Sequence, residues 1–274
     1  MKGFNRYLAG LILFAGFVCC GHDEPAINND FTVQAFNPVN VNKTNNIQTY
    51  VHYMPWFENK QSSANGQWGI HWTMSTRNPD NVDENGRHEI ASHFYPLIEP
   101  YASGDPNLIE YHLLLMKYAG IDGLLIDWYG STDFNDYGQN RRNCEILIDL
   151  LGKTGLKFAV VYEDRTIKAA CTIDPSFDRI SGAQYDMQYL EQNYFKNSAY
   201  INIKGKPLLL VFGPEEFHTP AEWEEILSVL SVEPCFVVLN GKSTETAPFS
   251  CGEYIWVDNT DLDTKYAKKD LFDM

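Results

Sequence analysis

The sequence predicts an α/β fold of the (β/α)8 TIM-barrel type, because short apolar runs alternate with amphipathic stretches from Gln48 onward. Carboxylate, amide and indole side chains follow the apolar runs, as they do at the mouth of such a barrel. About six of the eight strand–helix units of a barrel can be recognised. We therefore expect one barrel domain over residues 48–274 that is incomplete at its C-terminal end.

Residues 1–20 have the pattern of an export signal. Two basic residues precede the apolar run Leu8–Val18, which is too short to span a bilayer. The run ends at Cys19 and Cys20, which resemble the acylated cysteine of a bacterial lipoprotein signal; the sequence leaves open which of them is acylated, and whether cleavage occurs without lipid. We expect an exported chain, anchored by lipid to a bacterial membrane and facing the periplasm or the cell surface, with residues 21–47 as a flexible tether.

Six apolar runs have the length and the residue types of buried strands. The first of them leads into a long loop that contains Trp and Gly and reaches about Ser92, and loops of that length are usually functional. The predicted strands are Thr49–Met54, Gly123–Trp128, Lys157–Tyr162, Leu208–Phe212, Phe236–Leu239 and Tyr254–Val257.

Helices are predicted between these strands by their start and stop signals. Asp105 and Pro106 supply an N-cap and a first-turn proline for a helix over Leu108–Tyr118. Thr219, Pro220 and Glu222 form a capping box before another helix. Two further helices are expected: one has Ile146, Leu147, Leu150 and Leu151 on one face and ends near Gly152, and one lies around Ala183–Asn193.

Asp127 and Glu163 are the predicted catalytic carboxylates. The carboxyl ends of parallel strands meet at one mouth of a barrel, and alternate residues of each strand face the barrel axis. Asp127 shares its parity with Leu125, and Glu163 shares its parity with Val161. Branched apolar residues suit a crowded interior, so both carboxylates are expected to point inward. The alternative is that one of them only pairs with a neighbour such as Arg165.

Aromatic and polar side chains at the strand ends and in the first long loop form the predicted substrate-binding set. Flat aromatic faces stack on the apolar face of a pyranose ring, while carboxylates and amides hydrogen-bond its hydroxyl groups. The alternative role for some of these aromatics is to pack the rim of the barrel. The predicted set is Tyr53, Trp56, His71, Trp72, Trp128, Tyr129, Glu215, Asn240 and Trp256.

Composition and spacing argue against several other classes of site. A formal net charge of −15 repels a nucleic-acid backbone. The chain has no HExxH or CxxC spacing, no GxSxG elbow and no phosphate-cradling glycine loop. We therefore expect no metal, no cofactor and no nucleic-acid partner. Cys144 and Cys235 are expected in the core, and the sequence leaves open whether Cys171 and Cys251 pair after export.

A series of short motifs occurs in order between roughly Thr49 and Met274. The motifs are Gly69–Thr73, Tyr95–Tyr101, Asp105–His112, Met116–Gly123, Ile126–Gly130 and Phe158–Asp164. Together they resemble the glycoside hydrolase family 71/99-like proteins, the group that contains the endo-α-mannosidases. The resemblance implies a (β/α)8 barrel that cleaves or binds α-linked, often mannose-containing glycans without metal or organic cofactor. It also implies that Glu163 contacts substrate and that Asp127 and Trp128 line the sugar site.

The same resemblance places the family's acid–base carboxylate pair beyond the last residue of this sequence. It implies a retaining mechanism in which the sugar's own 2-hydroxyl is the nucleophile, a variation on two-carboxylate glycoside hydrolysis. Two functions therefore compete, an endo-glycosidase acting on α-linked glycans and a surface lipoprotein that binds glycans without cleaving them. A third outcome is an unstable chain, because an open barrel exposes sheet edges.

Overall fold

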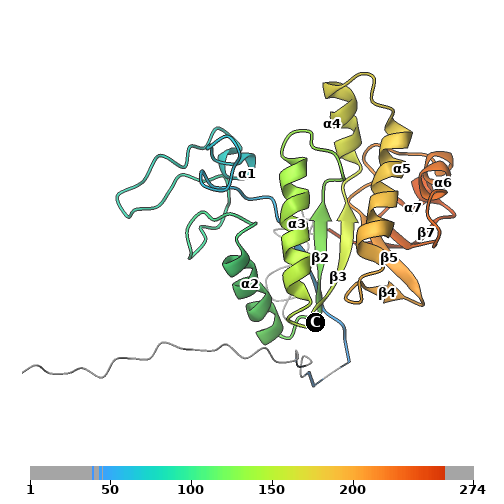
Figure 1. Ribbon diagram of the computed structural model, residues 1–274, viewed down its shortest axis with the longest axis horizontal. Coiled ribbons are helices and arrows are strands. Elements are labelled where there is room, and N and C mark those ends of the chain that lie inside the picture. The colour runs from blue at the N-terminus through green and yellow to red at the C-terminus, as the bar shows by residue number, and fades with distance from the viewer. Residues whose placement is uncertain (1–38, 40–42, 45, 257–274) are drawn as a thin grey trace, which may run out of the picture. The chain divides into compact units, whose positions relative to one another are not determined.

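Parallel strands joined by helices form the framework of the protein in the computed structural model (Figure 1). The structure describes residues 39, 43–44 and 46–256, all within one structural unit. The expected export signal lies outside the described residues, as does most of the expected tether. The predicted α/β class with a parallel sheet is confirmed.

The strands follow one another across the sheet in chain order, each parallel to the next. A two-residue strand, β4, pairs antiparallel with the start of β5. The strands are β1 (Tyr50–Tyr53), β2 (Gly123–Trp128), β3 (Lys157–Tyr162), β4 (Asn202–Ile203), β5 (Lys206–Val211), β6 (Cys235–Leu239) and β7 (Ser250–Tyr254). The bounds of β2 and β3 are those expected from the sequence, whereas the last strand lies four residues earlier than the predicted start at Tyr254.

Helices connect the strands and cover one face of the sheet. Asp105 caps α2 by accepting a hydrogen bond from Asn107 N at 2.9 Å, and Thr219 and Glu222 form the predicted capping box of α6. The helices are α1 (Ile70–Thr73), α2 (Pro106–Tyr118), α3 (Tyr137–Leu151), α4 (Arg165–Ile173), α5 (Arg179–Leu190), the π-helical η1 (Glu191–Phe195), α6 (Pro220–Leu227) and α7 (Ser243–Thr246). In Figure 1, α3 and α5 flank the strands β2 and β3. No helix among the described residues is long and apolar enough to cross a membrane.

Side chains alternate between the two faces of each strand, as the pleat requires. On β2, Leu124, Ile126 and Trp128 are fully buried, and the Trp128 ring stacks on Tyr189 of α5 with centroids 5.8 Å apart. This helix-covered side is the outer face of the sheet. The opposite parity, which includes Asp127, therefore belongs to the inner face.

The sheet is strongly curved. A flat sheet would separate β1 from β7 by five strand spacings, roughly 24 Å. The ring of His52 on β1 instead stacks on Tyr254 of β7 at 5.7 Å, and it meets Trp256 edge-on at 4.8 Å. Rings from the first and last described strands can meet only if the sheet curls about its inner face, as the strands of a barrel do.

The start of β2 packs so closely against β3 that only glycine fits. Gly123 lies opposite Lys157, and a Cβ atom on Gly123 would lie 2.4 Å from the Lys157 carbonyl oxygen. We expect Gly123→Ala to lower the free energy of unfolding by about 1–3 kcal/mol, because the strands must separate. Gly152→Ala is the matched control, since its Cβ would meet only Asp149 O at 4.0 Å, and it should change that free energy by less than about 0.5 kcal/mol. Urea denaturation of both variants measures this, and equal stabilities would contradict the close packing.

Candidate functional site

Asp127 and Glu163 lie side by side on the inner face at the carboxyl ends of β2 and β3. Parallel register aligns Trp128 with Tyr162, and Glu163 N donates to Trp128 O at 3.1 Å. Asp127 and Glu163 are therefore close neighbours across the strand pair. Each is only 3% exposed, and their carboxyl groups are in hydrogen-bonding contact. The structure thus brings together the two carboxylates expected to face inward.

Burial and proximity give these two carboxyl groups different protonation states. Burial and the neighbouring Glu163 charge raise the pKa of Asp127 well above its usual value. Burial also raises the pKa of Glu163, but the guanidinium of Arg165, which contacts it, opposes that rise. Asp127 therefore holds the proton and donates it toward an ionised Glu163. The alternative drawn from the sequence is that Glu163 only pairs with Arg165. In the structure Glu163 contacts both Arg165 and Asp127.

A cavity of about 960 Å³ opens beside Glu163. Its volume lies at the upper end of the range for small-molecule sites, roughly 300–1,000 Å³. Glu163 and Tyr129 contribute to its floor, and the long loop after β1 and the segment leading into α3 form its walls. Among the described residues, no group of three or more His, Cys, Asp or Glu side chains is arranged to hold a metal ion.

Aromatic rings lie along this cavity, and Trp56, which does not line it, packs behind the lining residue His71. Trp56 stacks on His71 with centroids 4.3 Å apart and planes 4° from parallel. The Tyr129 hydroxyl lies 3.3 Å from His71 Nε2, and Asp136 lies 3.5 Å from the same nitrogen. His71 of α1 lines the cavity together with Tyr129 and Asp136, which both lie in the loop between β2 and α3.

Several buried polar atoms have no hydrogen-bond partner within the described part of the chain. Glu58 Oε2 and His71 Nδ1 belong to residues that line the cavity, Trp56 Nε1 and Asp127 Oδ2 belong to residues in contact with lining residues, and Trp128 Nε1 and the Tyr194 hydroxyl lie in the core. Buried polar atoms are normally satisfied, so a cluster of unsatisfied ones beside a cavity indicates groups that a polar ligand would complete. Glu58 was not expected from the sequence, because it lies in the long loop five residues beyond β1.

Three residues of the predicted substrate-binding set point away from the cavity or lie in the packed interior. Trp128 faces the outer side of the sheet against Tyr189. Tyr53 also points outward, with its hydroxyl 3.1 Å from His112 Nδ1 of α2. Trp72 is 1% exposed and donates its indole N–H to Tyr101 O at 3.0 Å.

Glu215, Asn240 and Trp256 lie at the same ends of the strands but do not line the cavity. Glu215 and Asn240 are exposed, and Trp256 packs edge-on against Phe212 at 5.0 Å. The neighbouring Tyr254 is close enough to the carboxyl pair for the charges of Asp127 and Glu163 to raise its pKa, after the larger effect of burial. This side of the inner face is therefore electrostatically connected to the carboxyl pair, although it lies apart from the cavity.

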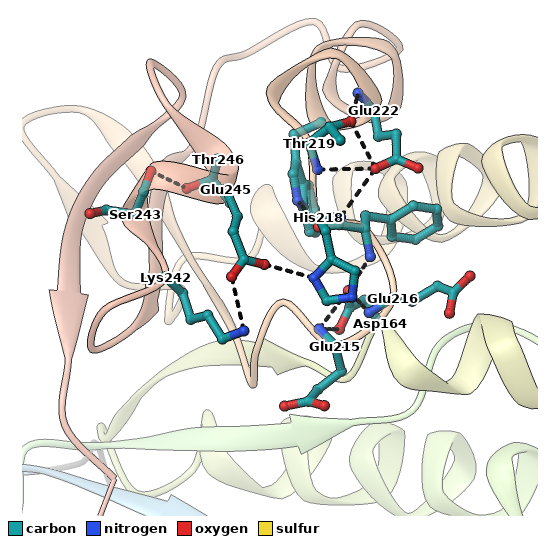
Figure 2. Close-up of polar contacts among 12 residues, drawn as sticks. Asp164, Glu215, Glu216, His218, Thr219, Glu222, Lys242, Ser243, Glu245 and Thr246 are labelled. Carbon is teal, nitrogen blue, oxygen red and sulfur yellow. Dashed lines mark hydrogen bonds and ion pairs between the residues drawn. The ribbon is translucent and has the colours of Figure 1, made fainter.

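Asp164 fixes the loop that carries Glu215 (Figure 2). Its fully buried carboxylate accepts backbone N–H bonds from Glu215, Glu216 and Phe217 at 2.9–3.1 Å. Burial raises the pKa of Asp164, while these three donors favour its charged form. Figure 2 shows the Glu215 carboxylate pointing away from this clamp, which holds only the backbone of the loop.

A second buried carboxylate, Asp186 of α5, fixes the loop after β2. It accepts hydrogen bonds from Ser131 N at 2.7 Å and from the Tyr162 hydroxyl at 2.8 Å. Gly130 has a φ of +96°, and a Cβ there would lie 2.8 Å from Asp186 Oδ2. Burial raises the pKa of Asp186 to about 6 despite its donors. The loop that follows Asp127 is thus held by an acid that titrates near neutrality.

A family model described as glycosyl hydrolase family 99 matches residues 44–234. Glycoprotein endo-alpha-1,2-mannosidase of Rattus norvegicus is 27% identical over 207 residues, which cover 69% of this chain and 42% of that protein. The endo-alpha-1,2-mannosidase-like protein of Danio rerio is 28% identical over 153 residues, which cover 53% of this chain and 32% of that protein. This chain thus spans about a third to two fifths of the length of these curated relatives.

Among solved structures, the GH99 endo-alpha-mannosidase from Bacteroides thetaiotaomicron matches with a TM-score of 0.56 and 23% identity. The match covers 77% of this chain and 61% of that one. A second structure of that enzyme, with bis-tris propane, matches with a TM-score of 0.54. The predicted barrel-type α/β fold is thereby confirmed.

The raised pKa values of the buried acids determine how the stability of the folded chain should depend on pH. An acid whose pKa is higher in the folded chain binds its proton more tightly there, so the free energy of unfolding falls as pH rises between the unfolded and folded pKa values. For Asp186, with a folded pKa of about 6, this loss amounts to about 3 kcal/mol. Asp127 adds to it, so the melting temperature should be lower at pH 7 than at pH 5.

Asp127→Asn should raise the melting temperature at pH 7 and flatten its dependence on pH, because the buried ionisable group is gone. Asp149→Asn, at an exposed position on α3, is the control and should follow the wild-type curve. Calorimetry at pH 5, 6 and 7 measures both. A wild-type melting temperature that rises from pH 5 to pH 7 would contradict the protonation states assigned to these acids.

Proposed function

Since the chain belongs to glycosyl hydrolase family 99, we propose that it acts on an α-linked, mannose-containing glycan held in the cavity beside Asp127 and Glu163. The observation that carries this proposal is the buried carboxyl pair, of which Glu163 lines a cavity that the rings of His71 and Tyr129 also line. Stacked rings and unsatisfied polar atoms complement the two sides of a pyranose, its apolar face and its hydroxyl groups. The names of the mannosidase relatives supply the sugar and the α-linkage.

The carboxyl pair suggests how the protein handles protons. Glu163 is the ionised member and lines the cavity, so it is the base that accepts a proton from a sugar hydroxyl. Asp127 keeps its own proton and donates it in a hydrogen bond to Glu163, which stabilises the negative charge on Glu163. If the substrate is cleaved, we propose a retaining, endo-type reaction in which the sugar's 2-hydroxyl attacks, with Glu163 as its base. The proposal includes no metal and no cofactor.

Glycan binding without cleavage is the second candidate, and one observation favours it. Two carboxyl groups that flank a glycosidic bond as nucleophile and acid are about 5–5.5 Å apart in retaining enzymes. Asp127 and Glu163 are instead in direct hydrogen-bonding contact, which leaves no room for a sugar between them. The pair therefore acts as one unit on one side of a ligand, and an acid on the other side would be needed for cleavage.

A Glu163→Gln variant tests the proposed function on α-1,2-linked mannan. We expect the wild-type chain to release oligosaccharides. The variant should release them at least about 100-fold more slowly, which is the loss typical of a removed general base. Glu233→Gln is the matched control, because Glu233 is exposed and pairs only with Lys206 at 2.7 Å. Product release is measured by chromatography, and binding by calorimetry.

The outcomes separate the two candidates. Binding by the wild-type chain without product, weakened in Glu163→Gln, supports the glycan-binding protein. Neither binding nor product in a chain that melts cooperatively would overturn the assignment to mannose-containing glycans.

We also propose that the chain is exported and anchored by lipid on a bacterial membrane, facing the periplasm or the cell surface. The apolar run Leu8–Val18 followed by Cys19 and Cys20 supports this. Metabolic labelling with an alkyne fatty acid should mark the wild-type chain and fail to mark the double variant Cys19→Ser, Cys20→Ser. Equal labelling of the two, or no labelling of either, would contradict the anchor.

A further inference from the structure

Two free cysteines lie next to one another where β6 and β7 begin. The two strands pair Phe236 with Ser250 and then Val237 with Gly252, so Cys251 is the extra residue of a bulge. Cys235 comes directly before Phe236, at the same end of the strand pair. The register thus places Cys251 beside this neighbour, and the two thiols are close enough to interact.

This pair is far along the strands from the candidate site. Cys235 is the first residue of β6, whereas the carboxyl pair lies at the opposite, carboxyl ends of the parallel strands. The charges of Lys206, the first residue of β5, and of Lys204, in the turn before it, reach Cys235. In barrels this end of the strands serves stability and not catalysis.

The structure also bears on the possible pairing of Cys171 with Cys251, which the sequence left open. Cys171 lies on α4, and its Sγ is 3.6 Å from Phe177 O. Cys251 has Cys235 as its neighbour instead. Cys144 is buried against the backbone of β2 and is inaccessible to an oxidant.

We propose that Cys235 and Cys251 form a disulfide bond that ties the edge strand β7 to β6. A small-molecule disulfide such as oxidised glutathione is a sufficient oxidant. The Cys251 thiolate attacks one glutathione sulfur and releases the first glutathione thiolate, and the Cys235 thiolate then attacks Cys251 Sγ and releases the second. The two protein thiols are oxidised, the one glutathione disulfide is reduced, and the two protons end on the two glutathione thiols.

The surroundings of the two thiols indicate which of them reacts with glutathione first. Burial and the hydrogen bond to Cys251 raise the pKa of Cys235 to about 11, so Cys235 keeps its proton and donates toward Cys251. Cys251 is exposed and therefore meets the oxidant first. Cys235 is close enough to resolve the mixed disulfide that results.

The bond would stabilise a strand whose centre is exposed. The central residues of β7 are exposed, and the strand is held by its pairing with β6 on one side. The disulfide closes a loop of roughly 15 residues, which restricts the unfolded chain. We expect the oxidised chain to melt roughly 5–10 °C above the reduced chain.

Mass spectrometry of the full chain after treatment with oxidised glutathione tests this proposal. Trypsin cleaves after Lys242, between the two cysteines, so the bond appears as peptide 205–242 linked to peptide 243–265 with the loss of two hydrogen atoms. Cys235→Ser and Cys251→Ser should each abolish both this species and the rise in melting temperature. Cys171→Ser is the control and should retain both.

Other products would overturn the proposal. Glutathione that remains attached to Cys251 of the wild-type chain would show that Cys235 cannot reach it. A link between Cys171 and Cys251, or unreacted Cys235 and Cys251 thiols after treatment, would equally contradict it. The melting temperatures, measured on the same samples with and without reductant, give a second readout that does not depend on peptide recovery.

Discussion

The parallel pairing of β2 with β3 is the constraint on which the candidate site depends. Because the two strands run in register over their whole length, the residues that end them are neighbours in space. Asp127 and Glu163 are thereby forced into contact on the inner face, away from water. Two acids in that position cannot both ionise, so the strand register fixes the protonation state of the site as well as its geometry. The loops after these strands line the cavity beside Glu163.

Two loops at this end of the sheet are held by buried acids. Asp186 binds the loop after β2, and Asp164 binds the loop after β5. Each accepts backbone N–H groups that the loops cannot pair internally. The burial that makes these carboxylates effective clamps also raises their pKa values. Rigidity of the cavity and sensitivity to pH therefore have the same physical origin.

Much of the fold could be predicted from the sequence, because hydrophobic runs and helix caps are local signals. Gly123–Trp128 and Lys157–Tyr162 are strands with the expected bounds, and Thr219 begins a helix as its capping box requires. Helix α4 was missed, since Asp164 does not cap it; its carboxylate is used by the loop at residues 215–217. The last strand was placed too late because Tyr254–Val257 is more apolar than the strand that forms, Ser250–Tyr254.

The candidate site was predictable to the extent that strand parity was applied. Parity correctly turned Asp127 inward, and the same rule requires its neighbour Trp128 to face outward, against Tyr189. The expectation that Trp128 binds sugar ignored this alternation, as did the one for Tyr53. Glu58 and the stacking of Trp56 on His71 depend on how a long loop folds back over the sheet, which no local pattern encodes.

The clamp formed by Asp164 has a consequence for how this protein can diverge in evolution. The carboxylate accepts hydrogen bonds only from the main-chain amides of residues 215–217. It makes no contact that depends on which side chain stands at the exposed position 215. Substitutions at the exposed Glu215 can accumulate without moving the loop, proline excepted, because proline has no amide hydrogen to offer. A single acid just beyond β3 thus fixes the backbone of this loop and leaves the side chain at position 215 free to change its chemistry.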